Sequence, residues 1–177
     1  VACRVYSELP ARELWARIVH AAYESAEPGV IFTDTVNREN NLSYCEQIST
    51  TNPCGEEPLP PYGACNLGSI NLVPFVTRAF AQDAAIDLDG IGSLTRTAVR
   101  LLDAVLDVSH YPLPAQQQTA QRSRRVGLGI TGLADALMLL NLHYDSKAAR
   151  SLAANVMQTI CHAAYEASIE LAIEKGP

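Results

Sequence analysis

Apolar residues recur every three or four positions along four segments of the chain, which is the spacing of an amphipathic helix. The pattern predicts helices over residues 10–25, 89–109, 133–141 and 146–175. In the second helix, Arg96, Arg100 and Asp103 fall outside the predicted buried stripe. That stripe consists of Ile91, Leu94, Ala98, Leu101, Leu102, Val105 and Val108. The last helix is predicted to bury Leu152, Val156, Ile160, Ala163, Ala167 and Leu171.

Three short segments have the composition or the alternation of β-strands. Residues 30–32 are β-branched and aromatic, residues 65–72 alternate, and residues 126–131 lead into the helix at residue 133. Residues 34–41 are predicted to form a polar connection or a short helix. From there to Pro61 the chain is rich in turn-forming residues.

Charge and hydropathy exclude several classes of protein. The formal net charge is −6 and the basic residues are mostly dispersed, so we expect no nucleic-acid binding. The apolar stretch at residues 132–142 is interrupted by Asp135 and is shorter than the ~20 residues of a membrane-spanning helix. We therefore expect no membrane span. The chain opens at Val1 without an initiator Met or a signal peptide, and we interpret it as an internal fragment.

The five cysteines are an odd number without a CxxC pair, which fits neither a disulfide framework nor a zinc site. We therefore predict a reducing, cytoplasmic location and no metal site. Cys3, Cys45 and Cys161 are expected to be small core residues.

One loop carries an amide, a thiol and a carboxylate at alternate positions, namely Asn52, Cys54 and Glu56. In an extended loop these three side chains would point the same way, so that one substrate could meet all of them. A nucleophilic thiolate needs a neighbouring cation, yet residues 39–77 contain no Lys or Arg and residues 21–109 contain no His. Because Glu56 is close, we expect Cys54 to remain a neutral thiol, which favours hydrogen-atom transfer over acyl transfer.

Longer blocks around this loop carry a family resemblance. The central block is Asn52-Pro53-Cys54-Gly55-Glu56, followed by Ala64-Cys65-Asn66-Leu67-Gly68-Ser69-Ile70-Asn71-Leu72. Three further blocks agree: Pro28-Gly29-Val30-Ile31-Phe32 with Asp34 and Asn37, Tyr111-Pro112-Leu113-Pro114, and Arg124-Arg125-Val126-Gly127-Leu128-Gly129-Ile130-Thr131-Gly132-Leu133-Ala134-Asp135. Essentially end to end, the chain resembles the catalytic subunit of ribonucleotide reductase.

This resemblance implies an α/β fold and a set of residue roles. The fold would be part of the ten-stranded α/β barrel of ribonucleotide reductases, helix-rich in this piece, with a finger loop at about residues 49–63. Residues 1–177 would form a single piece of that catalytic barrel domain and would be inactive alone.

The residue roles implied by the resemblance concern a thiyl-radical reaction on ribose. Cys54 would be the thiyl-radical cysteine that abstracts the 3′ hydrogen. Glu56 would take the proton of the 3′ hydroxyl, and Asn52 would hydrogen-bond the ribose hydroxyls. Cys65 would be one half of the dithiol that reduces the 2′ carbon. Its partner cysteine has no match in this sequence, and Cys3 is not assigned to that role.

The blocks also indicate a class within the family. Asn-Pro-Cys-Gly-Glu and the Gly-Leu-Gly-x-Thr-Gly-Leu-Ala-Asp run look like the adenosylcobalamin-dependent class, which implies that cofactor without identifying residues that bind it. The alternative is the large subunit of a class I enzyme that receives its radical from a separate di-metal subunit. Either class implies a ribonucleoside-diphosphate reductase with a ribonucleotide substrate, a thioredoxin-like or glutaredoxin-like reductant and a homodimeric parent protein.

Other interpretations of the same residues lead elsewhere. A helical interaction module would carry loop cysteines that are inert or bind a metal, and a thiolate hydrolase would carry a rapidly alkylated Cys54. Gly127, Gly129 and Gly132 match a dinucleotide-binding fingerprint. We reject a dinucleotide site because no acidic residue ends a second strand about 20 residues further on.

Overall fold

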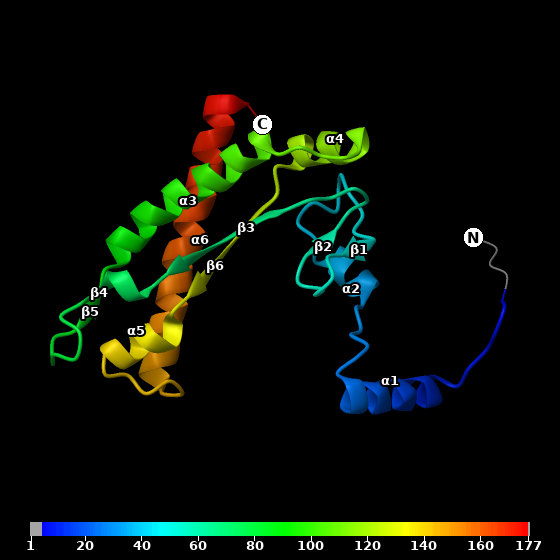
Figure 1. The fold of residues 1–177 in the computed structure, drawn as a ribbon, viewed down its shortest axis with the longest axis horizontal. Coiled ribbons are helices and arrows are strands. Elements are labelled where there is room, and N and C mark those ends of the chain that lie inside the picture. The colour runs from blue at the N-terminus through cyan, green and yellow to red at the C-terminus, as the bar shows by residue number, and fades with distance from the viewer. Residues whose placement is uncertain (1–4, 177) are drawn as a thin grey trace. The chain divides into compact units, whose positions relative to one another are not determined.

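A computed structural model of the chain describes residues 5–176, so Cys3 lies outside the described residues. The chain divides after Pro61 into two compact units, which we call the N-terminal unit and the C-terminal unit. Figure 1 shows the elements of each unit along the chain, from α1 to α6. Asn52, Cys54 and Glu56 belong to the N-terminal unit, and Cys65 belongs to the C-terminal unit.

The N-terminal unit contains two helices and a small hairpin. Helix α1 (Ala11–Ser25) begins directly after Pro10 and ends where Ala26 takes a left-handed φ of 59°. Helix α2 spans Thr33–Arg38, inside the segment predicted as a connection or short helix. Strands β1 (Thr50–Thr51) and β2 (Pro58–Leu59) pair antiparallel. The helix predicted for residues 10–25 is therefore confirmed.

The strand predicted at residues 30–32 is wrong. Val30, Ile31 and Phe32 pair with no strand among residues 5–176, and all three side chains are exposed. A β-strand needs a neighbour for its backbone hydrogen bonds, and β-branched composition does not supply one. Phe32 instead precedes α2, where its carbonyl accepts a hydrogen bond from the Val36 N–H at 3.0 Å.

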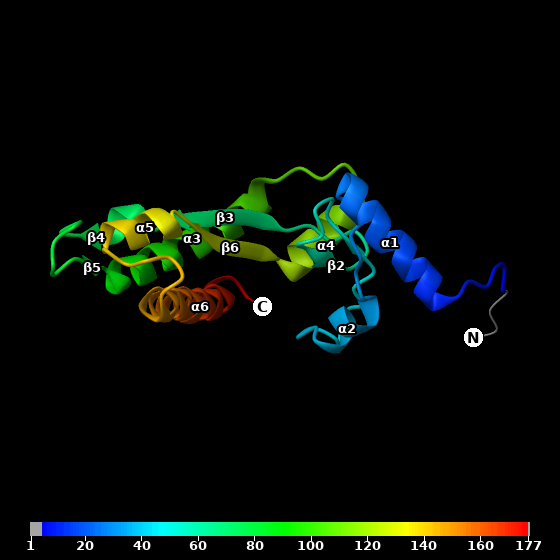
Figure 2. The ribbon, with the colours of Figure 1, turned by 90° about the horizontal axis from the view of Figure 1, so that it is seen from below.

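Two parallel strands lie at the centre of the C-terminal unit, β3 (Asn66–Asn71) and β6 (Val126–Thr131). They pair in register from Asn66 opposite Val126 to Asn71 opposite Thr131, and Figure 2 shows them side by side. Between them the chain forms η1 (Val73–Phe75), β4 (Val76–Thr77), β5 (Ala85–Ile86), α3 (Leu88–Val108) and α4 (Pro114–Ser123). After β6 it forms α5 (Leu133–Leu139) and α6 (Lys147–Lys175). Both predicted strands of this unit are confirmed.

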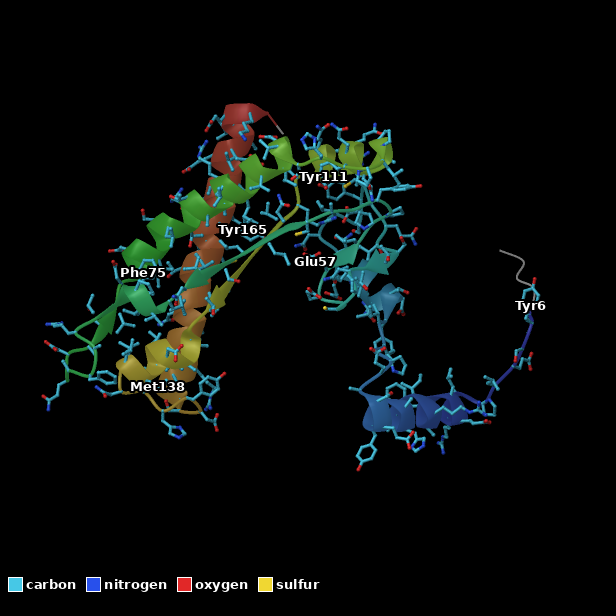
Figure 3. All side chains as sticks on the ribbon, viewed as in Figure 1. Tyr6, Glu57, Phe75, Tyr111, Met138 and Tyr165 are labelled. Atoms are coloured by element: carbon cyan, nitrogen blue, oxygen red, sulfur yellow. The ribbon has the colours of Figure 1, made fainter. Side chains whose placement is uncertain are left out.

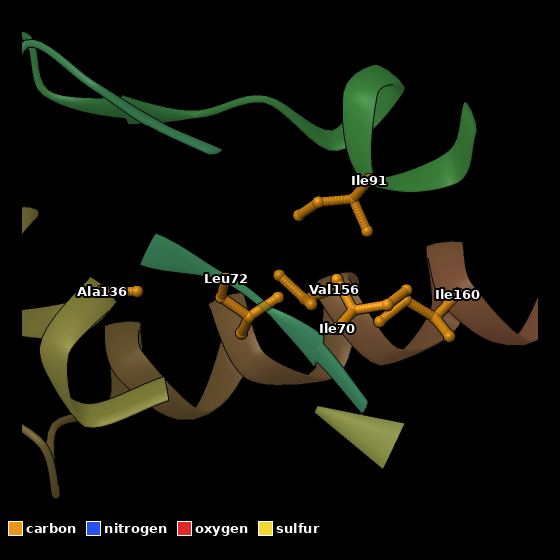
Figure 4. Close-up of a cluster of buried hydrophobic side chains, with 6 residues drawn as sticks. All are labelled: Ile70, Leu72, Ile91, Ala136, Val156 and Ile160. Carbon is orange, nitrogen blue, oxygen red and sulfur yellow. The ribbon is translucent and has the colours of Figure 1, made fainter. Parts of the chain in front are cut away.

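The main core of the C-terminal unit lies where β3 meets helices α3, α5 and α6 (Figure 4). Its buried side chains are Ile70, Leu72, Ile91, Ala136, Val156 and Ile160. Full burial of a large aliphatic side chain stabilises a fold by about 1.5–3 kcal/mol. On β3, Ile70 is buried whereas Ser69 and Asn71 are exposed, so that one strand face covers the core and the other faces away.

Helix α3 buries Ile91 and Leu102 as predicted, but the rest of its buried face differs from the predicted stripe. Leu94 and Leu101 are exposed, Leu101 at 62%, whereas Thr95 and Asp103 are buried. The helix carries apolar residues on two sides, and its packing against β3, β6 and α6 selects one of them. Thr95 tolerates burial because its hydroxyl donates a hydrogen bond to the Ile91 carbonyl at 2.8 Å.

Helices α5 and α6 largely follow the predictions. On α6 the predicted face is buried except at Leu152, which is partly exposed, and Ala149 joins that face. Helix α5 ends at Leu139, two residues before the predicted end. It is apolar nearly all round, and its Met138, labelled in Figure 3, remains exposed.

Ion pairs join the outer edges of α3 and α6, which run side by side in Figures 1 and 2. Arg96 pairs with Glu166 and with Glu170, the latter at 2.7 Å, and Arg100 pairs with Glu174 at 2.6 Å. Both arginines lie outside the buried face, as predicted. Solvent screens exposed pairs of this kind, so the apolar contacts dominate the packing of the two helices.

Helices and short strands together make this an α/β fold. Within residues 5–176 the strands form three two-stranded sheets and no closed barrel. In that same range, no helix combines the length and the apolar character that crossing a membrane requires.

Candidate active site

Asn52, Cys54 and Glu56, which are predicted to act on one substrate, lie on the loop of the β1–β2 hairpin. Residues 52–57 connect the two strands, and the Asn52 N–H donates a hydrogen bond to the Glu57 carbonyl at 3.3 Å. The Asn52 side chain also bridges the base of the loop, because its Oδ1 accepts a hydrogen bond from the Glu57 N–H at 3.0 Å. Asn52 therefore holds the base of the loop with both its backbone and its side chain.

A tight turn presents Cys54. The Gly55 N–H donates to the Asn52 carbonyl at 3.1 Å, which makes residues 52–55 a β-turn with Pro53 at its second position. Proline presets the backbone angle that this position needs. Gly55 then takes a φ of +82°, a left-handed conformation that glycine adopts at little cost. Proline and glycine thus shape the two sides of the cysteine.

The loop is therefore not extended, and the alternation expected for Asn52, Cys54 and Glu56 does not describe it. A turn at Pro53 separates Asn52 from Cys54 instead. Cys54 and Glu56 are exposed and Asn52 is partly buried. Neither Cys54 nor Glu56 forms a hydrogen bond or an ion pair with any residue in the range 5–176. No cation of the described chain therefore pairs with the Cys54 thiol.

Asn37 positions the hairpin, a role that the sequence did not reveal. Its Nδ2 donates to the Ile48 carbonyl and its Oδ1 accepts from the Ile48 N–H, both at 2.8 Å. The amide thereby imitates a strand neighbour for the segment that leads into β1, and it fixes that segment to α2. The sequence pointed to Asn37 only through its place in one of the blocks that carry the family resemblance.

Cys65 lies in the C-terminal unit, immediately before β3, and is partly buried. The next residue fixes its backbone. The Asn66 N–H donates to the Arg125 carbonyl at 3.2 Å, and Asn66 Nδ2 donates to the Leu102 carbonyl at 3.1 Å. A Cβ placed on Gly127 of β6 would lie 3.7 Å from Cys65 Sγ, so the thiol lies beside that strand.

Four charged residues form a cluster next to the start of β6. Asp103 accepts hydrogen bonds from Arg124 Nε and from Lys175 Nζ, each at 2.6 Å. Asp107 accepts from the same two side chains at 2.8 Å and 3.2 Å. The cluster joins α3, the residue at the end of α4 and the last turn of α6, and it borders a cavity of about 200 Å³.

These contacts shift the pKa values of the cluster. The hydrogen bond from Arg124 lowers the pKa of Asp103, burial opposes that shift, and the hydrogen bond from Lys175 adds to it. The same two partners lower the pKa of Asp107, Arg124 first. Hydrogen bonds to Asp103 and Asp107 raise the pKa of Lys175. All of these groups therefore stay charged at neutral pH. The expectation that Asp103 lies on the outer face of its helix is wrong because its charge is paired on the inner side.

The prediction that Cys45 and Cys161 are core residues is wrong, because both are exposed. Among residues 5–176 none of the cysteines forms a disulfide. Cys161 follows the buried Ile160 on α6, and one residue further along a helix points to another face. In the described part of the chain, no group of three or more His, Cys, Asp or Glu residues is arranged to hold a metal ion.

The four predicted site residues thus fall into two places. Asn52, Cys54 and Glu56 share the loop of one hairpin, and Cys65 stands at the start of β3 in the other unit. The sequence missed the residues that position them, Asn37 and Asn66, because their contacts join segments that are distant along the chain.

Comparison with known proteins identifies the family. The family model described as "Ribonucleotide reductase, barrel domain" matches residues 2–177. A vitamin B12-dependent ribonucleoside-diphosphate reductase of Mycobacterium tuberculosis is 43% identical over 98% of this chain and 24% of its own length. Its namesake in Thermoplasma acidophilum is 39% identical over 98% of this chain and 22% of its own length.

A relative with a different name is also similar. A ribonucleoside-diphosphate reductase large chain of Neurospora crassa is 35% identical over 94% of this chain and 18% of its own length. The chain therefore spans about a quarter or less of the length of these relatives. Because the family model covers nearly every residue, the chain belongs to the ribonucleotide reductase barrel-domain family.

Proposed function

We propose that the whole protein is a ribonucleoside-diphosphate reductase that makes deoxyribonucleotides by thiyl-radical chemistry, and that this chain forms part of its ten-stranded α/β barrel. One observation carries the proposal. The hairpin loop offers the exposed Cys54 between Asn52 and Glu56, without a cation of the described chain paired to it. A nucleophilic thiolate would need such a cation, whereas a neutral thiol is suited to exchanging hydrogen atoms.

In the proposed reaction, the Cys54 thiyl takes the hydrogen atom from C3′ of the ribose. An S–H bond forms, the C3′–H bond breaks, and the unpaired electron moves to carbon. Glu56 accepts the proton of the 3′ hydroxyl, which stabilises the adjoining radical. Asn52 Nδ2, which forms no hydrogen bond to residues 5–176, donates to a ribose oxygen. The 2′ hydroxyl then takes one proton from the dithiol that includes Cys65 and leaves as water.

Cys65 supplies half of the reducing equivalents for the 2′ carbon. Cys65 and a second thiol, which we assign to no residue of this chain, together give two electrons and two protons. The 2′ carbon–oxygen bond is replaced by a carbon–hydrogen bond, and the two sulfurs become a disulfide. Cys54 finally returns its hydrogen atom to C3′ and Glu56 returns its proton to the 3′ oxygen, which regenerates the thiyl and the carboxylate. A thioredoxin-like or glutaredoxin-like protein then reduces the disulfide.

We propose adenosylcobalamin as the source of the radical. When bound, this cofactor supplies an unpaired electron by homolysis of its cobalt–carbon bond. The described residues fit this cofactor as the acceptor of the radical, because the Cys54 thiol is exposed at a turn. We assign no residue of this chain to holding the corrin. The two relatives named vitamin B12-dependent, at 43% and 39% identity, support this class.

The second candidate is the large subunit of a class I enzyme served by a separate di-metal subunit. The relative named a large chain, at 35% identity, supports it. For either class we propose a ribonucleoside diphosphate as substrate, a cytoplasmic location and a homodimeric parent protein.

Deoxynucleotide formation by the full-length protein tests the proposal. With a ribonucleoside diphosphate and a dithiol, product should form only when adenosylcobalamin is added, and Cys54→Ala should abolish it. Cys45→Ala, at another exposed cysteine of the N-terminal unit, should leave the rate unchanged. Product that requires a di-metal subunit instead would assign the protein to class I. Activity retained in Cys54→Ala together with stoichiometric zinc would favour an interaction module with structural cysteines.

A further inference from the structure

We propose that Gly127 is a positioning residue for Cys65: the missing side chain at this place on β6 keeps the Cys65 thiol open to its reaction partner. This inference rests on the role proposed for Cys65 as a reductant. It concerns β3 and β6, which belong to the same unit.

The register of the two strands places Gly127 on the same face as the thiol. Gly127 pairs with Leu67, and paired residues in a parallel ladder point to the same side of the sheet. Cys65 precedes Leu67 by two positions, so it shares that side. This is the strand face directed away from the core, because Ile70 is buried on the opposite side and Leu67 is 58% exposed.

The side chains of Leu67 and Cys65 lie next to Gly127. A Cβ built at Gly127 would lie 2.5 Å from Leu67 Cδ2 and 3.7 Å from Cys65 Sγ. The first distance is too short for a carbon–carbon contact, so the flexible end of Leu67 would have to move. The added methyl group would then contact the sulfur from the side of β6, next to the displaced leucine.

Backbone conformation does not explain the glycine. Gly55, Gly132 and Gly176 are the described glycines with positive φ, and Gly127 is not among them. An alanine could adopt its backbone angles without strain of that kind. What an alanine at this position would meet is the flexible end of Leu67, together with an ordinary van der Waals contact to the Cys65 sulfur.

Gly129 provides a matched control on the same strand and the same face. It pairs with Ser69, and a Cβ built there would lie 3.5 Å from Ser69 Oγ, an ordinary contact that involves no cysteine. Any general effect of alanine on β6 should appear equally in Gly127→Ala and Gly129→Ala.

The test measures alkylation of Cys65 by N-ethylmaleimide in the reduced full-length protein, read peptide by peptide with mass spectrometry. Gly127→Ala should slow alkylation of Cys65 about five-fold, the change that corresponds to roughly 1 kcal/mol. Alkylation of Cys161, an exposed thiol of the same unit, should not change and reports intact folding. Gly129→Ala should leave the Cys65 rate as in the parent protein. Leu67→Ala added to Gly127→Ala should restore that rate, because it removes the displaced side chain.

Two results would overturn the proposal: equal slowing by Gly127→Ala and Gly129→Ala, or a Cys65 rate in Gly127→Ala that matches the parent protein. A single-turnover assay without external reductant separates this inference from the proposed function. If Gly127→Ala slows Cys65 alkylation selectively while Cys65→Ser still forms one equivalent of product, Gly127 positions the thiol and the reductive role of Cys65 is wrong.

Discussion

Asn52 Oδ1 accepts a hydrogen bond from the Glu57 N–H at 3.0 Å across the base of the hairpin loop. The other half of this amide, Nδ2, forms no hydrogen bond to residues 5–176. One side chain thus combines an acceptor that shapes the loop with a donor that is available to a substrate. Two substitutions separate these roles.

Asn52→Asp keeps the acceptor and removes the donor, whereas Asn52→Ala removes both. We expect the Glu57 amide to keep its protection from hydrogen exchange in Asn52→Asp and to lose about 1 kcal/mol of protection in Asn52→Ala. Both variants should lose about tenfold or more in kcat/KM. Equal loss of Glu57 protection in the two variants would show that the side-chain acceptor does not hold the loop.

Glu56→Gln and Glu57→Gln form a matched pair on neighbouring residues. Glu56 is exposed on the loop, whereas Glu57 is partly buried. Removal of a general base typically costs about 10²–10⁴ in rate, so Glu56→Gln should lower kcat by that amount. Glu57→Gln should retain nearly full kcat, since we assign it no proton transfer. Similar kcat values for the two variants would contradict the assignment of Glu56 as the base.

Cys54 should react slowly with N-ethylmaleimide at neutral pH although its side chain is exposed. Cys45 is the internal reference, because it is an exposed thiol of the same unit. A neutral Cys54 should be alkylated within about tenfold of the Cys45 rate, whereas an activated thiolate would exceed that range. Fast, selective labelling of Cys54 would favour the thiolate hydrolase.

The Asp103 cluster should stabilise the end of α6 in a pH-dependent manner. Because the folded-state pKa of Asp103 is lowered, its contribution is present above the unfolded value of about 3.9 and is lost as pH falls through the lower folded value. Because the pKa of Lys175 is raised, its contribution is present below about 10.4 and is lost as pH rises through the higher folded value.

Amide protection in the last turns of α6, corrected for the intrinsic exchange rate, measures this stabilisation. It should be level between these limits and fall below about pH 4. Asp103→Ala should remove about 1.5–3 kcal/mol of protection, the usual value of hydrogen bonds to charged groups. Asp107→Ala should have a smaller effect, because its carboxylate is exposed and screened by solvent. An equal loss of amide protection in Asp103→Ala and Asp107→Ala would show that burial does not make the contribution of Asp103 the larger one.

Local patterns predicted most elements of the fold. Helices α1 and α6 and strands β3 and β6 follow from periodicity and from the residues that bound them. The buried face of α3 did not follow, because the helix has apolar residues on two sides and only its neighbours select one. The segment at residues 30–32 has strand-like composition, yet a strand depends on a partner that no local pattern supplies.

The candidate site rests on residue type and motif more than on geometry. Asn52, Cys54 and Glu56 do share a loop, but a turn at Pro53 joins them, and alternation does not describe a turn. The contacts of Asn66 with Leu102 and of Arg124 with Asp103 join residues far apart in sequence. Spacing carries no information about such contacts until the fold is known.

The parallel pairing of β3 with β6 has a consequence for the growing polypeptide. Among residues 5–176, β6 is the partner of β3, and the ribosome makes it only after α3 and α4. Until then β3 lacks this partner, and the Cys65 sulfur lacks the strand that flanks it in the native fold. In the nascent chain at this stage the thiol is therefore more accessible to oxidation and to misplaced disulfides than in the native fold.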